Sequence, residues 1–165
     1  CFVLSEILKE NYDIPVTGVF TVQEEIGLRG SATAAFKVNP DYAIVIESTF
    51  ASDVPDTREE EHCTTLGKGP AITLMDMTYI AQKDMIRRIV RIADKYKIPY
   101  QYKRSTFGGT DGGRIYTTRE GVQTVIFSIP SRYIHSPASV MSINDYNNTF
   151  ALLKEVLSQF EKEEI

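Results

Sequence analysis

Two apolar runs constrain the fold of this chain more than any other feature. Residues 42–47 (Tyr-Ala-Ile-Val-Ile-Glu) and residues 122–129 are rich in β-branched side chains, which is typical of buried strands. Between them, apolar residues recur three or four positions apart over residues 83–96, as on one face of an amphipathic helix. Strands that alternate with helices in this way predict an α/β fold with helices on both faces of the sheet.

The remaining segments are assigned from the same patterns and from turn residues. The predicted strands are residues 15–22, 42–47, 71–74, 100–103 and 122–129, and the predicted helices are residues 1–10, 27–36, 83–96 and a last helix with an apolar stripe at Phe150, Leu153, Val156, Leu157 and Phe160. Loops are expected at residues 52–68 and in the glycine-rich stretch 106–113. Ser142 is expected to cap the last helix, with Asp145 three residues later in a short-armed capping box.

Length, composition and charge limit the classes of protein that this chain can represent. A length of 165 residues with 42% hydrophobic and 24% charged residues suits one globular domain. The net charge of −4 argues against a nucleic-acid partner. No apolar run reaches about 18 residues, so no membrane-spanning segment is expected. Cys1 and Cys63 are the only cysteines, and two free thiols indicate a reducing, cytoplasmic location.

Polar residues suited to chemistry follow the predicted strands. They are Glu24, Glu25, Glu47, Thr110, Asp111 and His135. The carboxyl ends of the strands of an open α/β sheet border one crevice, so we expect these residues to converge there. Carboxylates with an imidazole make sites for zinc, cobalt or manganese. Of two adjacent glutamates, one can hold a metal while the other handles a proton, and two metals about 3.5–4 Å apart can clamp a water and a carbonyl oxygen.

Each of these residues also has a simpler interpretation. Glu24 and Glu25 suit the positively charged start of a helix, Glu47 suits a helix cap or a turn, and His135 suits an ordinary loop. His62 lies in a charge run typical of solvated surface, so it is not expected to be a ligand. The glycine-rich stretch lacks the Lys-Ser/Thr of a P-loop, and no Gly-x-Ser-x-Gly elbow is present.

Five ordered motifs resemble those of the M42 metallo-aminopeptidases, a family that includes the tetrahedral TET peptidases and proteins named glutamyl aminopeptidase or endoglucanase. The motifs are Val22-Gln23-Glu24-Glu25-Ile26-Gly27-Leu28-Arg29-Gly30, residues 44–55, Gly67-Lys68-Gly69-Pro70-Ala71-Ile72, Gly108-Gly109-Thr110-Asp111 and Arg132-Tyr133-Ile134-His135-Ser136-Pro137. The resemblance covers nearly the whole chain. It implies a zinc-peptidase (phosphorylase/hydrolase-like) catalytic domain with a mixed sheet flanked by helices.

The resemblance also implies roles for individual residues. Glu24 matches the general base, which takes a proton from the attacking water and returns it to the leaving amine. Glu25 and His135 match the ligands of one metal, and Glu47 matches the acidic ligand of the other, which is Asp in many members. Two residues are given supporting roles beside the site: Thr110 and Asp111. The implied cofactors are two divalent ions, zinc or cobalt, with manganese also compatible.

The chain departs from the family pattern in its N-terminal region. The family has a further His ligand and a bridging Asp upstream of the helix that residues 1–10 resemble. Residues 1–165 are therefore expected to be the C-terminal portion of the catalytic domain, without its N-terminal part and inserted β-rich domain. Three ligands without the bridge should bind metal weakly, so this chain alone is expected to be inactive. Its full-length parent is expected to remove N-terminal residues from peptides and to form a homo-oligomer, which in the family is a tetrahedral dodecamer.

Two other functions compete with this hypothesis. Glycoside hydrolases also use two carboxylates, and relatives carry an endoglucanase name. However, the motif order matches metal ligands, and the chain has no Trp to stack on sugars. A chelator separates the two, because a two-carboxylate glycosidase should survive it. A non-catalytic shell subunit would instead keep its biological activity after Glu24→Gln.

Overall fold

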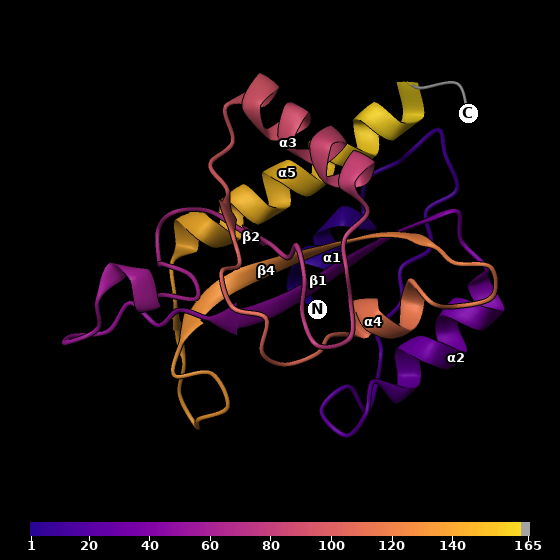
Figure 1. Ribbon diagram of the computed structural model, residues 1–165. Coiled ribbons are helices and arrows are strands. Elements are labelled where there is room, and N and C mark those ends of the chain that lie inside the picture. The colour runs from indigo at the N-terminus through magenta and orange to yellow at the C-terminus, as the bar shows by residue number, and fades with distance from the viewer. Residues whose placement is uncertain (163–165) are drawn as a thin grey trace.

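A computed structural model describes residues 1–162 of the chain (Figure 1). Its elements, in chain order, are α1 (Phe2–Ile7), α2 (Arg29–Val38), β1 (Tyr42–Phe50), the 3₁₀ helix η1 (Glu59–Glu61), β2 (Ala71–Ile72), α3 (Lys83–Tyr96), β3 (Gln101–Tyr102), α4 (Asp111–Ile115), β4 (Gln123–Arg132), β5 (Val140–Met141) and α5 (Ile143–Lys162). The strands form one sheet in the order β1-β4-β2-β3, and β5 pairs with the end of β4.

The sheet is mixed and has helices on both faces. β1 runs parallel to β4, β4 runs antiparallel to β2, and β2 runs parallel to β3. Helices α1, α3 and α5 cover one face, while α2 and α4 lie on the other (Figure 1). The α/β fold expected from the alternation of strands and helices is confirmed.

The long strand β4 separates two layers of core, because alternate side chains of a strand point to opposite faces. Phe127 is fully buried in the larger cluster, together with residues of α3 and α5. Ile126, one residue earlier, packs against Val45 of β1 and against Tyr79 on the opposite face. Burying each such side chain stabilises the fold by roughly 1.5–3 kcal/mol. Glu47 lies two residues after Val45 and therefore shares the face on which α2 and α4 lie.

Several elements differ in extent from the prediction. Helix α3 has the predicted bounds, but β1 and β4 each continue three residues further, to Phe50 and Arg132. Ser48 and Thr49 pair with Ile129 and Pro130 in the register of β1 and β4. Polar residues can therefore belong to a strand when a neighbouring strand pairs with them. β2 and β3 are shorter than expected. Helix α4 begins inside the stretch predicted as a glycine-rich loop, where no helix was expected.

The strand predicted at residues 15–22 is wrong. The segment is irregular and mostly exposed, and among residues 1–162 no strand pairs with it. A strand requires hydrogen bonds to a neighbour, so β-rich composition alone does not make one. The last residue of this segment, Val22, lies against the first turn of α2, where its carbonyl oxygen accepts a hydrogen bond from the Gly30 N–H at 3.0 Å. A Cβ on Gly30 would lie 2.5 Å from the Val22 carbonyl oxygen, so only glycine permits this close approach.

The start of α5 combines one confirmed and one wrong prediction. Ser142 caps the helix, because its Oγ accepts a hydrogen bond from the Asn144 backbone N–H at 3.2 Å. The capping box is wrong. The completely buried carboxylate of Asp145 instead accepts hydrogen bonds from the backbone N–H groups of Gly67 and Gly69, each at 2.7 Å. Asp145 therefore ties the start of α5 to the loop that precedes β2.

Asp145→Ala is expected to lower the free energy of unfolding by about 2–4 kcal/mol, because the buried Gly69 N–H and the partly buried Gly67 N–H lose their acceptor, at roughly 1–3 kcal/mol for a buried group and less for a partly exposed one. Asp84→Ala is the matched control. Asp84 also lies in the first turn of a helix, but its side chain is 95% exposed and pairs with Arg87, so its loss should matter little. Urea denaturation followed by circular dichroism measures both variants. Equal losses would show that Asp145 acts only through the helix dipole.

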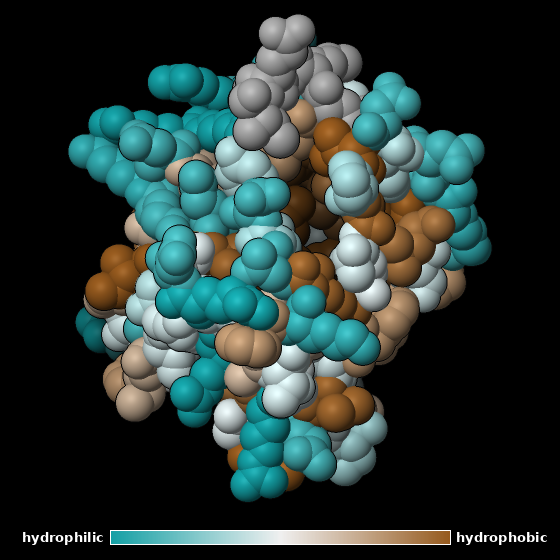
Figure 2. Space-filling view, turned by 90° about the vertical axis from the view of Figure 1, so that its right-hand side faces the viewer, coloured by the Kyte–Doolittle hydropathy of each residue, from teal (hydrophilic) through white to brown (hydrophobic). Residues whose placement is uncertain are grey.

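The surface carries hydrophobic side chains near α2. Viewed from the side of the molecule on which α2 lies, the surface shows several hydrophobic areas, some of which border a hollow (Figure 2). The large exposed apolar residues of α2 and of the segment before it are Val19, Phe20, Val22, Ile26, Phe36 and Val38. Apolar surface of this kind is typical of contacts with other polypeptide segments. Within residues 1–162, the structure has no helix with the length and apolar character needed to cross a membrane.

Candidate active site

Glu47 lies within β1 and not past its end, which corrects the expected position. Its neighbour in the strand register is Ser128, whose Oγ donates a hydrogen bond to Glu47 Oε1 at 2.7 Å. Burial raises the pKa of Glu47 to about 7, opposed by the Ser128 hydrogen bond and by the positive charge of Lys103. The negative charges of Glu24 and Asp76 raise this pKa further. A carboxyl perturbed by burial and by named neighbours is a candidate functional group.

Glu24 and Glu25 lie in the tight turn that leads into α2. The Leu28 N–H donates to the Glu24 carbonyl oxygen at 2.9 Å, and φ is positive at Gly27 (120°) and Leu28 (56°). Positive φ is unfavourable for leucine, but Leu28 is buried, so its packing holds the turn. The backbone from which both carboxylates project is thereby fixed.

His135 lies in the turn between β4 and β5, far from Glu25 in the sequence. Its Nδ1 is 3.5 Å from Glu25 Oε1, and its ring meets the ring of Phe50 in an edge contact with centroids 5.9 Å apart. Both His135 and Glu25 are more than half exposed. The tertiary structure therefore brings together an imidazole and a carboxylate that solvent or a metal ion can reach.

Glu24 interacts electrostatically with Glu25, Asp111 and His135, and we call these four residues the Glu24 cluster. The pKa of Glu24 is raised first by burial and then by the negative charges of Glu25 and Asp111, while His135 lowers it. Charges influence one another in this way only over short distances, so each of these three charges lies near enough to act on the Glu24 carboxyl. A raised pKa brings this carboxyl nearer to the value at which proton exchange with a substrate is efficient at neutral pH.

Thr110 and Asp111 connect this cluster to the protein interior. Asp111 Oδ2 accepts a hydrogen bond from Thr21 Oγ1 at 2.6 Å. Asp111 Oδ1 is buried and has no hydrogen-bond partner within residues 1–162. Thr110 is buried, and its Oγ1 donates to Asp76 Oδ2 at 3.3 Å. A buried oxygen without a partner is unusual in a folded protein, so Asp111 is placed to accept one more donor.

Sequence reasoning missed two charged residues of this region, Asp76 and Lys103. Asp76 is buried and accepts hydrogen bonds at Oδ1 from the N–H and Oγ1 of Thr78. No motif surrounds it in the sequence, so no signal was available. Lys103 follows β3 at the end of a predicted strand. Glu47 was selected because it ends a predicted strand, and the same criterion would have selected Lys103.

Residues 1–152 match the model of a known family, the M42 glutamyl aminopeptidases. The chain belongs to this family. It is 39% identical over 159 residues to a putative aminopeptidase of Acetivibrio thermocellus, and the alignment covers 95% of this chain and 48% of that protein.

Solved structures agree with this assignment to the M42 family. Aminopeptidase APDkam598 from the archaeon Desulfurococcus kamchatkensis matches with a TM-score of 0.91 and 41% identity, over 98% of this chain and 45% of that chain. The Pyrococcus horikoshii TET1 peptidase, which can assemble into a tetrahedron or a large octahedral shell, matches with a TM-score of 0.69 and 32% identity, over 84% of this chain and 39% of that chain. This chain spans less than half the length of each of the three proteins.

The M42 resemblance implies two divalent metal ions. The donor types of the site match, because carboxylates and imidazoles bind such ions. The donor number does not match. Within residues 1–162, no group of three or more His, Cys, Asp or Glu side chains is placed to hold a metal. Glu25 and His135 form one facing pair, and Glu47 is not grouped with them. A catalytic zinc takes three protein ligands, so these residues make an incomplete metal site.

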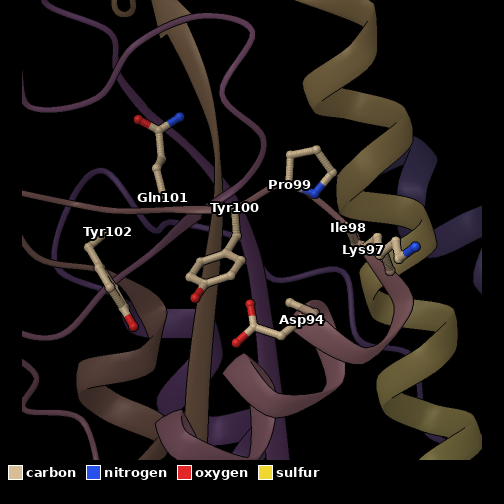
Figure 3. Close-up of a pocket in the computed structure, with 8 residues that line it drawn as sticks. Asp94, Lys97, Ile98, Pro99, Tyr100, Gln101 and Tyr102 are labelled. Carbon is tan, nitrogen blue, oxygen red and sulfur yellow. The ribbon is translucent and has the colours of Figure 1, made fainter.

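An open pocket of about 520 Å³ lies elsewhere, at the C-terminal end of α3 and beside β3 (Figure 3). Its lining includes Asp94, Tyr100 and Tyr102, and none of the candidate M42 site residues. The Tyr100 hydroxyl lies between the side chains of Asp94 and Tyr102 (Figure 3). The pKa of Tyr100 is raised by burial and by the nearby Tyr102 and Asp94. Because no residue of the Glu24 cluster lines this pocket, the pocket is separate from the candidate active site.

Proposed function

We propose that residues 1–165 supply part of the active site of a divalent-metal-dependent aminopeptidase, which removes N-terminal residues from peptides. The observation that carries this proposal is the cluster of Glu24, Glu25, Asp111 and His135 in a chain of the M42 family. Such a cluster offers a carboxyl with a raised pKa beside a carboxylate–imidazole pair. Hydrolysis of a peptide bond requires both proton transfer and stabilisation of negative charge on the carbonyl oxygen.

Each residue has one role in this proposal. Glu24 takes a proton from the attacking water and returns it to the leaving amine. Glu25 and His135 would hold one metal ion and Glu47 would hold the other, with further ligands that residues 1–162 do not supply. The ions are zinc or cobalt, with manganese also suitable. When bound, they supply the Lewis acidity that polarises the water and the peptide carbonyl. Supporting roles fall to two residues, Thr110 and Asp111.

The charge of Asp111 assists Glu24 as a base. It is one of the negative charges that raise the pKa of Glu24, and Thr21 fixes the orientation of its carboxylate. A base with a raised pKa accepts a proton more readily, provided that it remains ionised at the working pH. The role of Asp111 is therefore electrostatic as well as structural.

The direct test is metal content and peptidase activity of the full-length protein. We expect about two divalent ions per chain, release of free N-terminal residues from unblocked peptides, loss of activity with a chelator, and its return with zinc or cobalt. The isolated residues 1–165 are expected to show weak metal binding and no cleavage. A glycoside hydrolase would survive chelation and cleave a polysaccharide. A metal-free protein that leaves peptides intact would contradict the proposal.

A homo-oligomer is the proposed assembly of the full-length protein. Two observations support it, the shells formed by the TET1 peptidase of Pyrococcus horikoshii and the exposed apolar side chains near α2. Native mass spectrometry measures the number of chains directly. A monomer at micromolar concentration would contradict this part of the proposal.

A further inference from the structure

Asp53 and Arg132 form a two-point ion pair beside the segment that carries His135. Arg132 Nε donates to Asp53 Oδ1 at 2.9 Å, and Arg132 Nη2 donates to Asp53 Oδ2 at 3.0 Å. The Asp53 side chain is only 8% exposed, so water competes little for it. A planar guanidinium that meets both carboxylate oxygens fixes orientation as well as distance.

This ion pair connects the two strands that lead to proposed metal ligands. Asp53 follows β1, which contains Glu47, and Arg132 is the last residue of β4, three residues before His135. The connection is reinforced at the backbone, where the Ala51 N–H donates to the Ser131 carbonyl oxygen at 2.9 Å. A change in this pair would therefore move the His135 turn relative to β1.

Asp53 also has a partner in a third segment. Its Oδ2 accepts a hydrogen bond from the Leu66 N–H at 2.9 Å. The Arg132 hydrogen bond is the main reason that the pKa of Asp53 lies below its ordinary value, and the Leu66 hydrogen bond contributes in the same direction. The carboxylate is thus held from two sides and is a fixed point to which Arg132 attaches.

Within the His135 turn, the Ser136 N–H donates to the Tyr133 carbonyl oxygen at 3.2 Å and the Ser136 Oγ donates to the Ala138 carbonyl oxygen at 2.7 Å. Both hydrogen bonds are local, so they do not fix the turn relative to β1. β5 pairs with β4 over only two residues, and a two-stranded hairpin is marginal on its own. Tyr133 and His135 have φ angles of 60° and 63°, which are costly for residues other than glycine. The turn therefore needs a fixed attachment at its base, which is where Arg132 lies.

We propose that the Asp53–Arg132 pair is a positioning pair that orients the His135 turn, so that the imidazole faces Glu25 and can serve as a metal ligand. The metal-binding part rests on the proposed function. The orienting part does not, because it concerns the metal-free turn. The pair touches neither substrate nor metal, and acts only through His135.

The test compares Arg132→Lys with wild type in the full-length protein. Lysine keeps the positive charge but loses the two-point geometry. We expect it to bind Zn²⁺ or Co²⁺ about 10–100-fold more weakly, as for other residues that orient a metal ligand. The visible absorption spectrum of the Co²⁺-loaded protein should change. In the metal-free protein, backbone amides of residues 131–141 should exchange hydrogen faster, as measured by mass spectrometry.

The matched control is Arg58→Lys. Arg58 also meets a carboxylate, that of Glu61, through Nε and Nη2, but these side chains at η1 are 71% and 47% exposed. Metal affinity, spectrum and exchange of residues 131–141 should match wild type in this variant. Asp53→Asn provides a second variant of the pair in case Arg132→Lys does not fold. It keeps the size of the side chain and should reproduce the spectral and exchange changes.

The outcomes separate this proposal from the proposed function. Wild-type affinity, spectrum and exchange in folded Arg132→Lys and Asp53→Asn would overturn the positioning role, even if the protein is a metal-dependent peptidase. If wild type binds no metal, the proposed function fails and hydrogen exchange decides alone. Faster exchange of residues 131–141 in the variants then supports the orienting role, and unchanged exchange overturns it.

Discussion

Glu24→Gln is expected to slow peptide cleavage by the full-length protein about 10²–10⁴-fold, the usual contribution of a general base. Glutamine fills the same volume but cannot take a proton from water and return it to the amine. Because Glu24 is proposed to carry a proton and not to hold a metal, the loss should appear in kcat with little change in KM or metal content. Steady-state kinetics and elemental analysis of the purified variant measure these quantities.

The matched control for this prediction is Glu120→Gln, the same substitution at an exposed residue outside the Glu24 cluster. It should cleave peptides as well as wild type does. Full activity in Glu24→Gln would remove the proposed base. Loss of bound metal in Glu24→Gln would instead make Glu24 a ligand, and the division of roles between Glu24 and Glu25 would be wrong.

The second large effect concerns the dependence of stability on pH in the metal-free protein. Burial raises the pKa of Glu47 from 4.5 to about 7 in the folded state. Between these values the folded state keeps a proton that the unfolded state has lost, so stability falls as pH rises. This one residue should contribute fully below about pH 4.5 and lose roughly 3 kcal/mol as pH rises through 7. Other groups also titrate, so the contribution must be isolated with a variant.

The variant Glu47→Gln isolates the contribution of Glu47 to the pH dependence of stability. In urea denaturation of the metal-free protein, this variant should be close to wild type at pH 5 and more stable than wild type at pH 8. Ser128→Ala removes the hydrogen bond that favours the ionised form, so it should shift the fall to higher pH. Added Zn²⁺ should stabilise wild type more than Glu47→Gln at pH 8, because metal binding needs the ionised carboxylate. A constant difference between wild type and Glu47→Gln from pH 5 to pH 8 would contradict the raised pKa.

Much of the fold was predictable because its signals are local. The spacing of apolar residues over 83–96 gave a helix with the bounds of α3, and the apolar runs at 42–47 and 122–129 located β1 and β4. Residues 15–22 carry the same β-rich signal, yet no strand among residues 1–162 pairs with them. A strand depends on a neighbour that its own sequence does not specify.

Asp145 shows that the hydrogen-bond partner of a polar residue, like the neighbour of a strand, is not specified by the local sequence. Its place three residues after Ser142 predicted a capping box, but its carboxylate binds two backbone N–H groups of the loop at residues 67–69. The helix start was correctly located because the Ser142 cap is local. The partner of Asp145 lies far along the chain, and proximity of this kind is decided by packing.

The sequence by itself determined the α/β class, the M42 resemblance and the identity of the candidate donors, since these depend on residue types and their spacing. The tertiary structure decided which donors meet. It brings His135 to within 3.5 Å of Glu25, turns Glu47 to the face shared by α2 and α4, and places Asp53 against Arg132. The reason is physical: side-chain spacing records the local period of a helix or strand. The approach of distant segments depends on strand register, buried charge and the conformation of turns, which arise only when the whole chain packs.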